Sequence, residues 1–257
     1  MYPNEQPRQP EALALRIGTP RAEKTRQHII DAAGPLFAEK GYKATTVGEI
    51  CRIAGVNQAA ISFHFGGKEQ LYLALVRYSY EYGLAQVPMP QWPAGTPAAV
   101  KLRDFVLTFL RRAVADREPR WPCQLIMRET MQPSQACEEF VRGFVRPNIE
   151  VLQGILQELL PADFSEEARR LVVNSIIGQG LFYRVARGVL ELLSPGDQPL
   201  RFDEERLQVL AEHITRFTLA ALGVLPPLSF NPEPAATVAS AAGSGLDAAP
   251  PSPPAPG

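Results

Sequence analysis

The sequence predicts an all-α protein. Apolar residues recur three and four positions apart over nearly the whole stretch from residue 20 to residue 223, which is the spacing of one face of a helix. Alternating apolar and polar runs bounded by turn residues, the pattern of half-buried strands, do not appear. With 257 residues, 46% of them hydrophobic, the chain has enough apolar side chains for one large domain or two modest ones.

The two ends of the sequence differ from its middle. Residues 1–18 include Pro3, Pro7 and Pro10, and we expect a flexible arm there. Residues 226–257 contain nine prolines and eight alanines but only two charged residues, a composition that predicts a disordered tail. Between these ends we expect a first helical domain over residues 19–67 and a larger one over residues 68–225.

Charge and hydropathy exclude several classes of protein. A net charge of −1 excludes a nucleic-acid binder that works by overall basicity, although a local basic patch remains possible. No run approaches the roughly 18 apolar residues of a membrane span, and the N-terminus lacks the basic start and long apolar stretch of a signal peptide. We therefore expect a cytoplasmic protein that does not contact the membrane.

The chain carries no recognisable catalytic or metal-binding pattern. Its three cysteines, Cys51, Cys123 and Cys137, are an odd number without a CxxC and lie in apolar helical patterns, so we expect no disulfide, metal or cofactor. Three widely separated histidines and the lack of GxSxG, phosphate-loop or zinc-spacing motifs argue against an enzyme.

The first expected helix runs from about residue 20 to residue 40. Ile29 and Phe37 lie on its apolar face, and Gly41 is its stop. Pro35 lies inside it and predicts a bend near Ala32, because proline removes a backbone hydrogen bond.

Three shorter segments follow, each marked by local capping signals. Thr46 opens the second helix, and Glu49 three residues later completes a capping box. Its expected apolar face is Val47, Ile50 and Ile53, with Cys51 buried and Gly55 at its end. Asn57 caps a third helix, Gln58 to Phe65, which Gly66 and Gly67 separate from a fourth that begins at Lys68.

Five longer helices are expected after residue 95, for a total of nine. They begin at polar caps or at prolines. Their expected ranges are 96 to about 116, opened by Thr96-Pro97; 121 to about 131, opened by Trp121-Pro122; 133–160, with a kink at Pro147; 165 to about 193, capped by Ser165; and 203–223, capped by Asp203.

The second and third expected helices, joined by the turn at residues 55–57, have the pattern of a helix-turn-helix. The string TRQHIIDAAGPLFAEKGYKATTVGEICRIAGVNQAAISFHFGGKEQLYLALV, from Thr25 to Val76, resembles the N-terminal domain of the TetR (tetracycline repressor) family of transcriptional regulators. The resemblance is carried by Phe37, Gly41-Tyr42, Thr45-Thr46, Ile50, Ile53-Ala54-Gly55-Val56, His64-Phe65, Lys68-Glu69 and Leu71.

This resemblance implies binding to double-stranded DNA, with the third helix in the major groove. By position, Gln58, Ala59 and Ser62 would face base edges, whereas Thr46, Lys68 and His64 would contact phosphates. Phe63 stands where the family often has tyrosine, so a hydroxyl contact to phosphate is missing there. The charge agrees, because residues 16–68 hold eight basic and four acidic side chains in a chain with a net charge of −1.

The later helices resemble the CecR branch of the family in the strings LIMRETMQPS, FVRPNIEVLQGILQELL and SIIGQGLFYRVARGVLELL, from roughly residue 121 to residue 193. The resemblance implies an effector-binding domain that dimerises through its last two helices. A two-fold dimer predicts a palindromic operator whose half-sites lie about 34–36 Å apart. Ligand binding would usually release the DNA through the fourth helix, about residues 68–86.

Bulky side chains along the later helices are candidates for an effector pocket, because such pockets are mostly apolar with a few polar groups. A filled core is the alternative for each of them, and Arg128 and Glu129 are alternatively a solvated pair. The candidates are Phe105, Phe109, Trp121, Met127, Arg128, Phe144, Gln179 and Tyr183.

The sequence thus favours a homodimeric, ligand-responsive repressor without enzymatic activity. One alternative is a TetR-like helical interaction protein that has lost DNA binding and works through its proline-rich tail. Activation instead of repression also stays open, and neither the effector nor the operator follows from the sequence.

Overall fold

The structure, a computed structural model, describes residues 19–116, 118–193 and 200–226. All regular elements in these ranges are helices, as predicted. The expected arm, residues 1–18, and nearly all of the expected tail, residues 226–257, lie outside the described residues. The chain divides into two compact units, residues 1–88 with 116–149 and residues 89–115 with 150–257.

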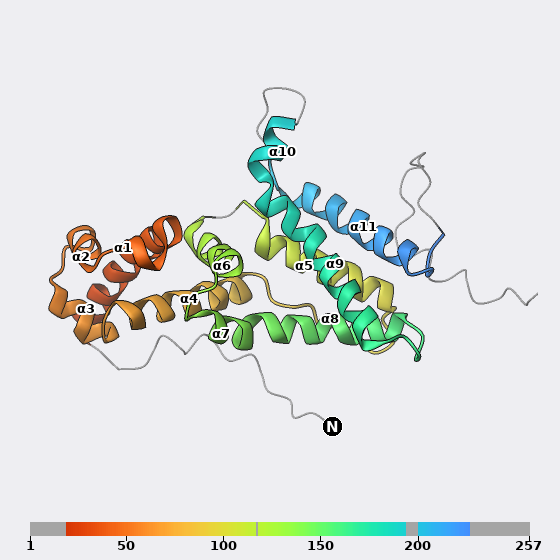
Figure 1. Cartoon of the computed structure of the whole chain (residues 1–257), viewed down its shortest axis with the longest axis horizontal. Helices are drawn as coiled ribbons and strands as arrows, with labels where there is room; N and C mark the ends of the chain where they lie inside the picture. Colours follow the sequence, from red (N-terminus) through yellow and green to blue (C-terminus); the bar gives the residue numbers. More distant parts are fainter. Residues whose placement is uncertain (1–18, 117, 194–199, 227–257) are drawn as a thin grey trace, which may run out of the picture. The chain divides into compact units, whose positions relative to one another are not determined.

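The first unit contains the helices of the expected helix-turn-helix together with helices from the middle of the chain (Figure 1). This grouping differs from a boundary between residues 67 and 68, because it joins the long fourth helix to the first three. Its helices are α1 (Pro20–Ala44), α2 (Val47–Ala54), α3 (Gln58–Phe65), α4 (Lys68–Gln86), α6 (Trp121–Met131), α7 (Cys137–Phe140) and the π-helical segment η2 (Val141–Val145).

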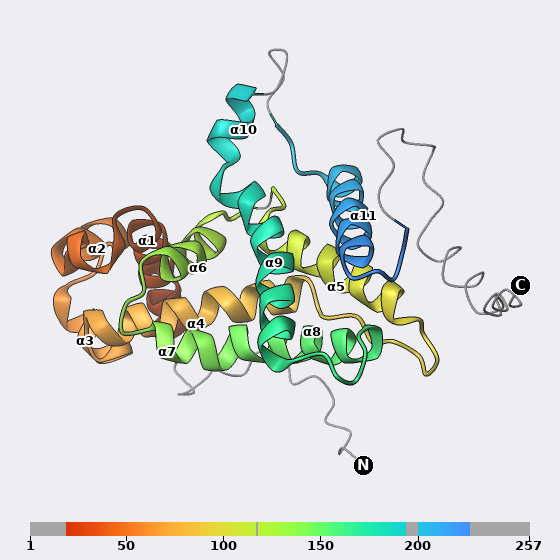
Figure 2. The same ribbon diagram turned by 45° about the vertical axis from the view of Figure 1, so that its right-hand side comes forward.

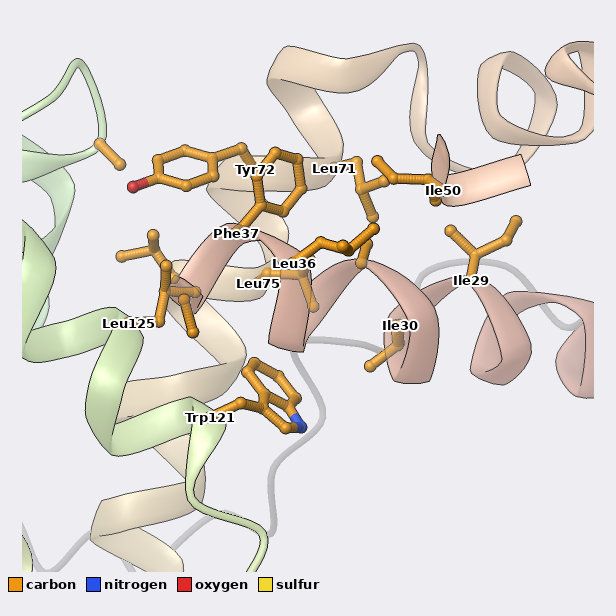
Figure 3. Close-up of a cluster of buried hydrophobic side chains, with 14 of the residues drawn as sticks. Ile29, Ile30, Leu36, Phe37, Ile50, Leu71, Tyr72, Leu75, Trp121 and Leu125 are labelled. Atoms are coloured by element: carbon orange, nitrogen blue, oxygen red, sulfur yellow. The ribbon is translucent and has the colours of Figure 1, made fainter. Parts of the chain in front are cut away.

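The core of this unit lies where α1, α4 and α6 meet (Figure 3). Phe37 of α1 meets Tyr72 of α4 edge to face, with ring centroids 5.0 Å apart. The indole of Trp121 lies very close to the α1 backbone at Gly34, where an added Cβ would come within 2.7 Å of the ring. A glycine at position 34 therefore sets how closely α6 approaches α1.

Helix α1 extends three residues beyond the expected stop, but its backbone breaks at Gly41. The φ of Gly41 is 81°, in the left-handed region, and the backbone around Pro35 keeps helical angles. The sequence therefore located the break correctly at Gly41, whereas the bend expected near Ala32 is not present in the backbone angles.

The second unit is built around α5 (Ala98–Ala113), which packs against α11 (Glu204–Ala221) and α9 (Glu166–Val185) (Figure 2). Ion pairs of Arg103 with Glu212 (3.2 Å) and of Arg111 with Glu204 link α5 to α11. The unit also contains most of α8 (Arg146–Leu159) and α10 (Arg187–Leu193).

Three expected helix boundaries are wrong. The helix after residue 95 has Pro97 as its N-cap, because the Thr96 hydroxyl donates to the Pro93 carbonyl instead of capping. The helix expected from residue 133 begins at Cys137, and its irregularity is the π-helical segment that ends just before Pro147. The helix expected to reach residue 193 is divided at Ala186.

None of the described helices combines the length and the apolar character that a membrane span requires. Within the same residues, no three histidine, cysteine or acidic side chains gather closely enough to hold a metal ion. Cys51 is buried, Cys123 and Cys137 are partly buried, and none of the three is in a disulfide.

Candidate nucleic-acid interface

Local capping bonds fix the helix-turn-helix. The Thr46 hydroxyl oxygen accepts a hydrogen bond from the Glu49 amide (3.2 Å) at the start of α2, and the Asn57 side chain accepts one from the Ala60 amide (3.0 Å) at the start of α3. Gly55, with a φ of 67°, ends α2 in the left-handed conformation. The sequence located both caps and this turn correctly.

The capping box is only half formed. The Glu49 carboxylate accepts from the Lys40 ammonium (2.5 Å) and so ties α2 to the end of α1. The Thr46 hydroxyl uses a lone pair for the cap and is exposed, so its own hydrogen can be donated outward. Ile53, expected on the apolar face of α2, is 50% exposed, and that expectation is wrong.

One face of α3 is exposed and the opposite face is buried. Ile61 is 1% exposed and anchors the helix in the core of the first unit. Gln58, Ala59 and Ser62, which the sequence selects to face base edges, are all exposed on the outer face. Phe63, which stands where the family often has tyrosine, is exposed there too.

The start of α4 carries a partly buried lysine and no side-chain cap. Gly67, with a φ of 121°, precedes the helix, so the first amides of α4 have no capping oxygen. The Lys68 ammonium lies 4.5 Å from the centroid of the Tyr42 ring, and burial lowers the pKa of Lys68. The uncapped amides of α4 and the Lys68 ammonium together favour the binding of an anion at this helix N-terminus.

A second cation, Arg26, holds the end of α3. Its guanidinium donates to the His64 carbonyl (3.3 Å) and lies 4.5 Å from the centroid of the Phe65 ring. The partly buried His64 ring packs edge to face on Phe63. From the sequence alone Arg26 is only one of the basic residues of this region. Its role in positioning α3 depends on a contact 38 residues away that no local pattern reveals.

The candidate effector residues in the first unit make internal contacts. Arg128 donates to the carbonyls of Ala38 (3.2 Å) and Glu39 (2.5 Å) at the end of α1, so it does not form the solvated pair with Glu129. Trp121 stacks on Tyr78, with centroids 5.5 Å apart. The remaining candidates here are Met127, which is partly buried, and Phe144, which stacks on Phe140.

Glu129, next to Arg128, is buried and fully bonded. Its carboxylate accepts from the Tyr72 hydroxyl, from the Ser134 amide (3.2 Å) and from the Ser134 hydroxyl (3.0 Å). Burial, followed by the hydrogen bond to Glu129, raises the pKa of Tyr72. The bond between Glu129 and Tyr72 connects α6 to α4, whereas the neighbouring Arg128 connects α6 to α1.

The candidates in the second unit also contact their neighbours. Phe105 is 1% exposed in the core, and Phe109 faces Gly180 so closely that a Cβ there would come within 2.4 Å of the ring. Gln179 donates to the Ser175 carbonyl (3.3 Å), and the Tyr183 ring meets Phe202 edge to face. The eight candidates are divided equally between the two units.

A cavity of about 490 Å³ lies in the first unit beside η2. Burial raises the pKa of Glu81 in its wall, while Arg77 is paired with Glu139. Phe144, a candidate, is next to Gly143 and has its ring 6.1 Å from that of Tyr80. The lining residues are Arg77, Tyr80, Glu81, Glu139, Arg142 and Gly143.

Helices α9 and α11 each expose a stripe of large apolar side chains. On α9 the stripe is Leu171 (62% exposed), Phe182 (54%) and Val185 (54%) at helical spacing, with Ser175 and Gly178 between them. On α11 it is Val209 (55%) and Phe217 (48%). Exposed apolar stripes on two helices of one unit indicate a protein interface.

Two family descriptions match the chain. Residues 29–75 match the family described as bacterial regulatory proteins, tetR family, and residues 98–222 match the C-terminal domain of the HTH-type transcriptional dual regulator CecR. CecR of Shigella flexneri is 26% identical over 206 residues, which are 77% of this chain and 91% of CecR. The HTH-type transcriptional regulator AcrR of Shigella flexneri is 26% identical over 166 residues, 61% of this chain and 76% of AcrR.

The fold is shared with solved structures. The crystal structure of a TetR-like transcriptional regulator from Rhodococcus sp. RHA1 matches with a TM-score of 0.55 at 21% identity, covering 79% of this chain and 99% of that one. The match over residues 29–75 and this likeness in fold agree with the helix-turn-helix described above.

Proposed function

Because the chain belongs to the TetR family of bacterial regulatory proteins and carries a CecR-type C-terminal domain, we propose that it is a homodimeric repressor of transcription that responds to a small-molecule effector. The observation that carries the DNA-binding part is the exposed outer face of α3 on a capped helix-turn-helix. Such a protein acts on chromosomal DNA in the cytoplasm, and its relatives are regulators, not enzymes.

In the proposed complex, α3 lies in the major groove and the two neighbouring helix starts contact the backbone. The free hydrogen of the Thr46 hydroxyl is suited to a phosphate oxygen, and Lys68 and the uncapped amides of α4 are suited to another. Gln58, Ala59 and Ser62 face the bases. His64 contacts phosphate in this proposal, since its ring is only partly buried.

The proposed dimer forms through α9 and α11. Their exposed apolar stripes are what a four-helix interface between two copies would cover, and Gly178 permits close helix approach on α9. A two-fold dimer presents two copies of α3 and therefore requires a palindromic operator.

The effector part of the proposal rests on the family resemblance and on the cavity beside η2. A ligand there would contact Tyr80 on α4, the helix whose start is proposed to hold phosphate. The ligand releases DNA only if it binds the DNA-free state of the protein more tightly than the DNA-bound state. The eight residues selected from the sequence remain candidates for contacts with the effector.

The test is selection of bound sequences from a random duplex library with the full chain at two salt concentrations. We expect a palindromic motif whose recovery falls at the higher salt. Lys68→Ala should weaken binding to all sequences alike and lower the salt slope by about one, while Gln58→Ala should change the preference among sites. No enrichment from a folded dimer would contradict the proposal and favour the interaction protein.

A further inference from the structure

The outer face of α3 is uncharged. Its four exposed residues, Gln58, Ala59, Ser62 and Phe63, are two polar neutral side chains and two apolar ones. No lysine or arginine occurs anywhere from residue 58 to residue 65. Arginine and lysine are the side chains that most often read guanine in the major groove. The helix therefore lacks the usual means of preferring G·C pairs.

Phe63 is exposed to an unusual degree for a phenylalanine. Its exposed fraction is 74%, and the only ring contact that it makes among the described residues is with its neighbour His64, at 5.1 Å between centroids. Ala59 lies four residues earlier on the same side of the helix, so the two form a continuous apolar strip. Packing of the first unit does not account for this strip, because Ile61 provides the buried contact of α3.

We propose that Phe63 and Ala59 read the 5-methyl groups of thymines, and that the operator is rich in A·T pairs where α3 contacts it. This inference rests on the proposed function. Thymine is the base that presents a methyl group in the major groove, and apolar side chains are its partners. Gln58 complements this recognition of thymine, since its carboxamide can pair bidentately with adenine.

Charge around the strip favours DNA over another apolar partner. Exposed basic side chains lie on α1, including its last turn, and on α2, and Lys68 stands at the start of α4. Basic side chains on the helices that adjoin a neutral α3 suit a duplex, whose phosphates flank the base edges in the groove. The basic residues are Arg21, Lys24, Lys43 and Arg52.

The test replaces single thymines by deoxyuridine in the operator obtained by the selection above, which removes only the methyl group. Affinity is measured by fluorescence anisotropy with the full chain. For the wild type we expect a loss of about fourfold for each thymine whose methyl group the strip contacts. For Phe63→Ala we expect weaker binding to the thymine operator and no further loss at the thymines that contact Phe63, while those that contact Ala59 keep their sensitivity.

Two further variants control for indirect effects. Phe63→Leu keeps an apolar side chain and should keep part of the sensitivity to deoxyuridine. Ile53→Ala removes a side chain that is also exposed, at 50%, but lies on α2, and it should respond to deoxyuridine as the wild type does. Thermal unfolding of each variant checks that the fold is kept.

The outcomes separate this inference from the proposed function. A palindrome with G·C pairs throughout its contacted bases would overturn the inference and leave the regulator intact. Unchanged affinity on every deoxyuridine operator, or equal losses for wild type and Phe63→Ala at every position, would also overturn it. Failure to enrich any sequence would overturn both.

Discussion

Hydrogen bonds from single side chains connect the helices of the first unit. The sequence allows Arg128 and Glu129 to form a solvated pair. Arg128 instead bonds the end of α1, and Glu129 bonds Tyr72 on α4. The identity of a residue does not show this, because the choice between a surface pair and a buried bond depends on which helix packs above it.

The buried bond between Tyr72 and Glu129 should contribute measurably to stability. Tyr72→Phe removes the donor and leaves one carboxylate oxygen of a fully buried Glu129 without that partner. We expect a loss of about 1–3 kcal/mol in the free energy of unfolding, measured by urea denaturation. Tyr82→Phe, which removes a hydroxyl from a partly exposed ring on the same helix, should change stability by less than about 0.5 kcal/mol. Equal effects of the two variants would contradict the assignment.

Gly34 should be intolerant of any side chain. A Cβ there would lie 2.7 Å from the Trp121 ring, so Gly34→Ala should cost about 1–3 kcal/mol through displacement of α6, despite the better helix propensity of alanine. Gly48→Ala on α2 is the matched control, since a Cβ there meets nothing within 4 Å, and it should raise stability by about 0.5–1 kcal/mol. Thermal unfolding of both variants would show opposite signs, and a shared sign would argue against the contact.

At the scale of elements, the sequence predicted best where the signals are local. The bounds of α3 and α6 and the start of α4 follow from caps, prolines and glycines within a few residues, and all three agree with the structure. The break at Ala186 and the π-helical segment before Pro147 were not predicted at their positions, because packing decides them. Likewise, bulky residues could be listed, but whether Phe105 fills a core depends on tertiary neighbours.

The exposed stripes of α9 and α11 should hold the dimer together. Phe182→Asp and Phe217→Asp place a charge where the proposed interface would bury it, and we expect monomers at micromolar concentration by light scattering after gel filtration. Ile53→Asp changes an equally exposed apolar residue in the other unit and should leave the dimer intact. Dimers that survive both stripe variants would show that the interface lies elsewhere.

At the scale of the whole molecule, the proposed function combines a weak contact between α3 and the bases with a symmetric contact between two copies of the chain. A single α3 of eight residues offers four exposed side chains to the bases. With each good base contact worth about 1–3 kcal/mol, one module discriminates poorly among genomic sites. Two modules held by one dimer add their base contacts, so the dimer interface determines specificity as much as α3 does.

This argument predicts that operator spacing is fixed. Insertion of about five base pairs between the half-sites rotates one by half a turn, and insertion of about ten separates them by a further 34 Å or so, beyond the one-turn spacing that a two-fold dimer spans. We expect both insertions to reduce affinity to that of an isolated half-site, as measured by anisotropy at constant salt. Phe182→Asp should bind the native and the inserted operators equally weakly, because a monomer does not sense spacing. If the wild type bound all three operators equally well, the two modules would act independently, and dimerisation would not determine operator choice.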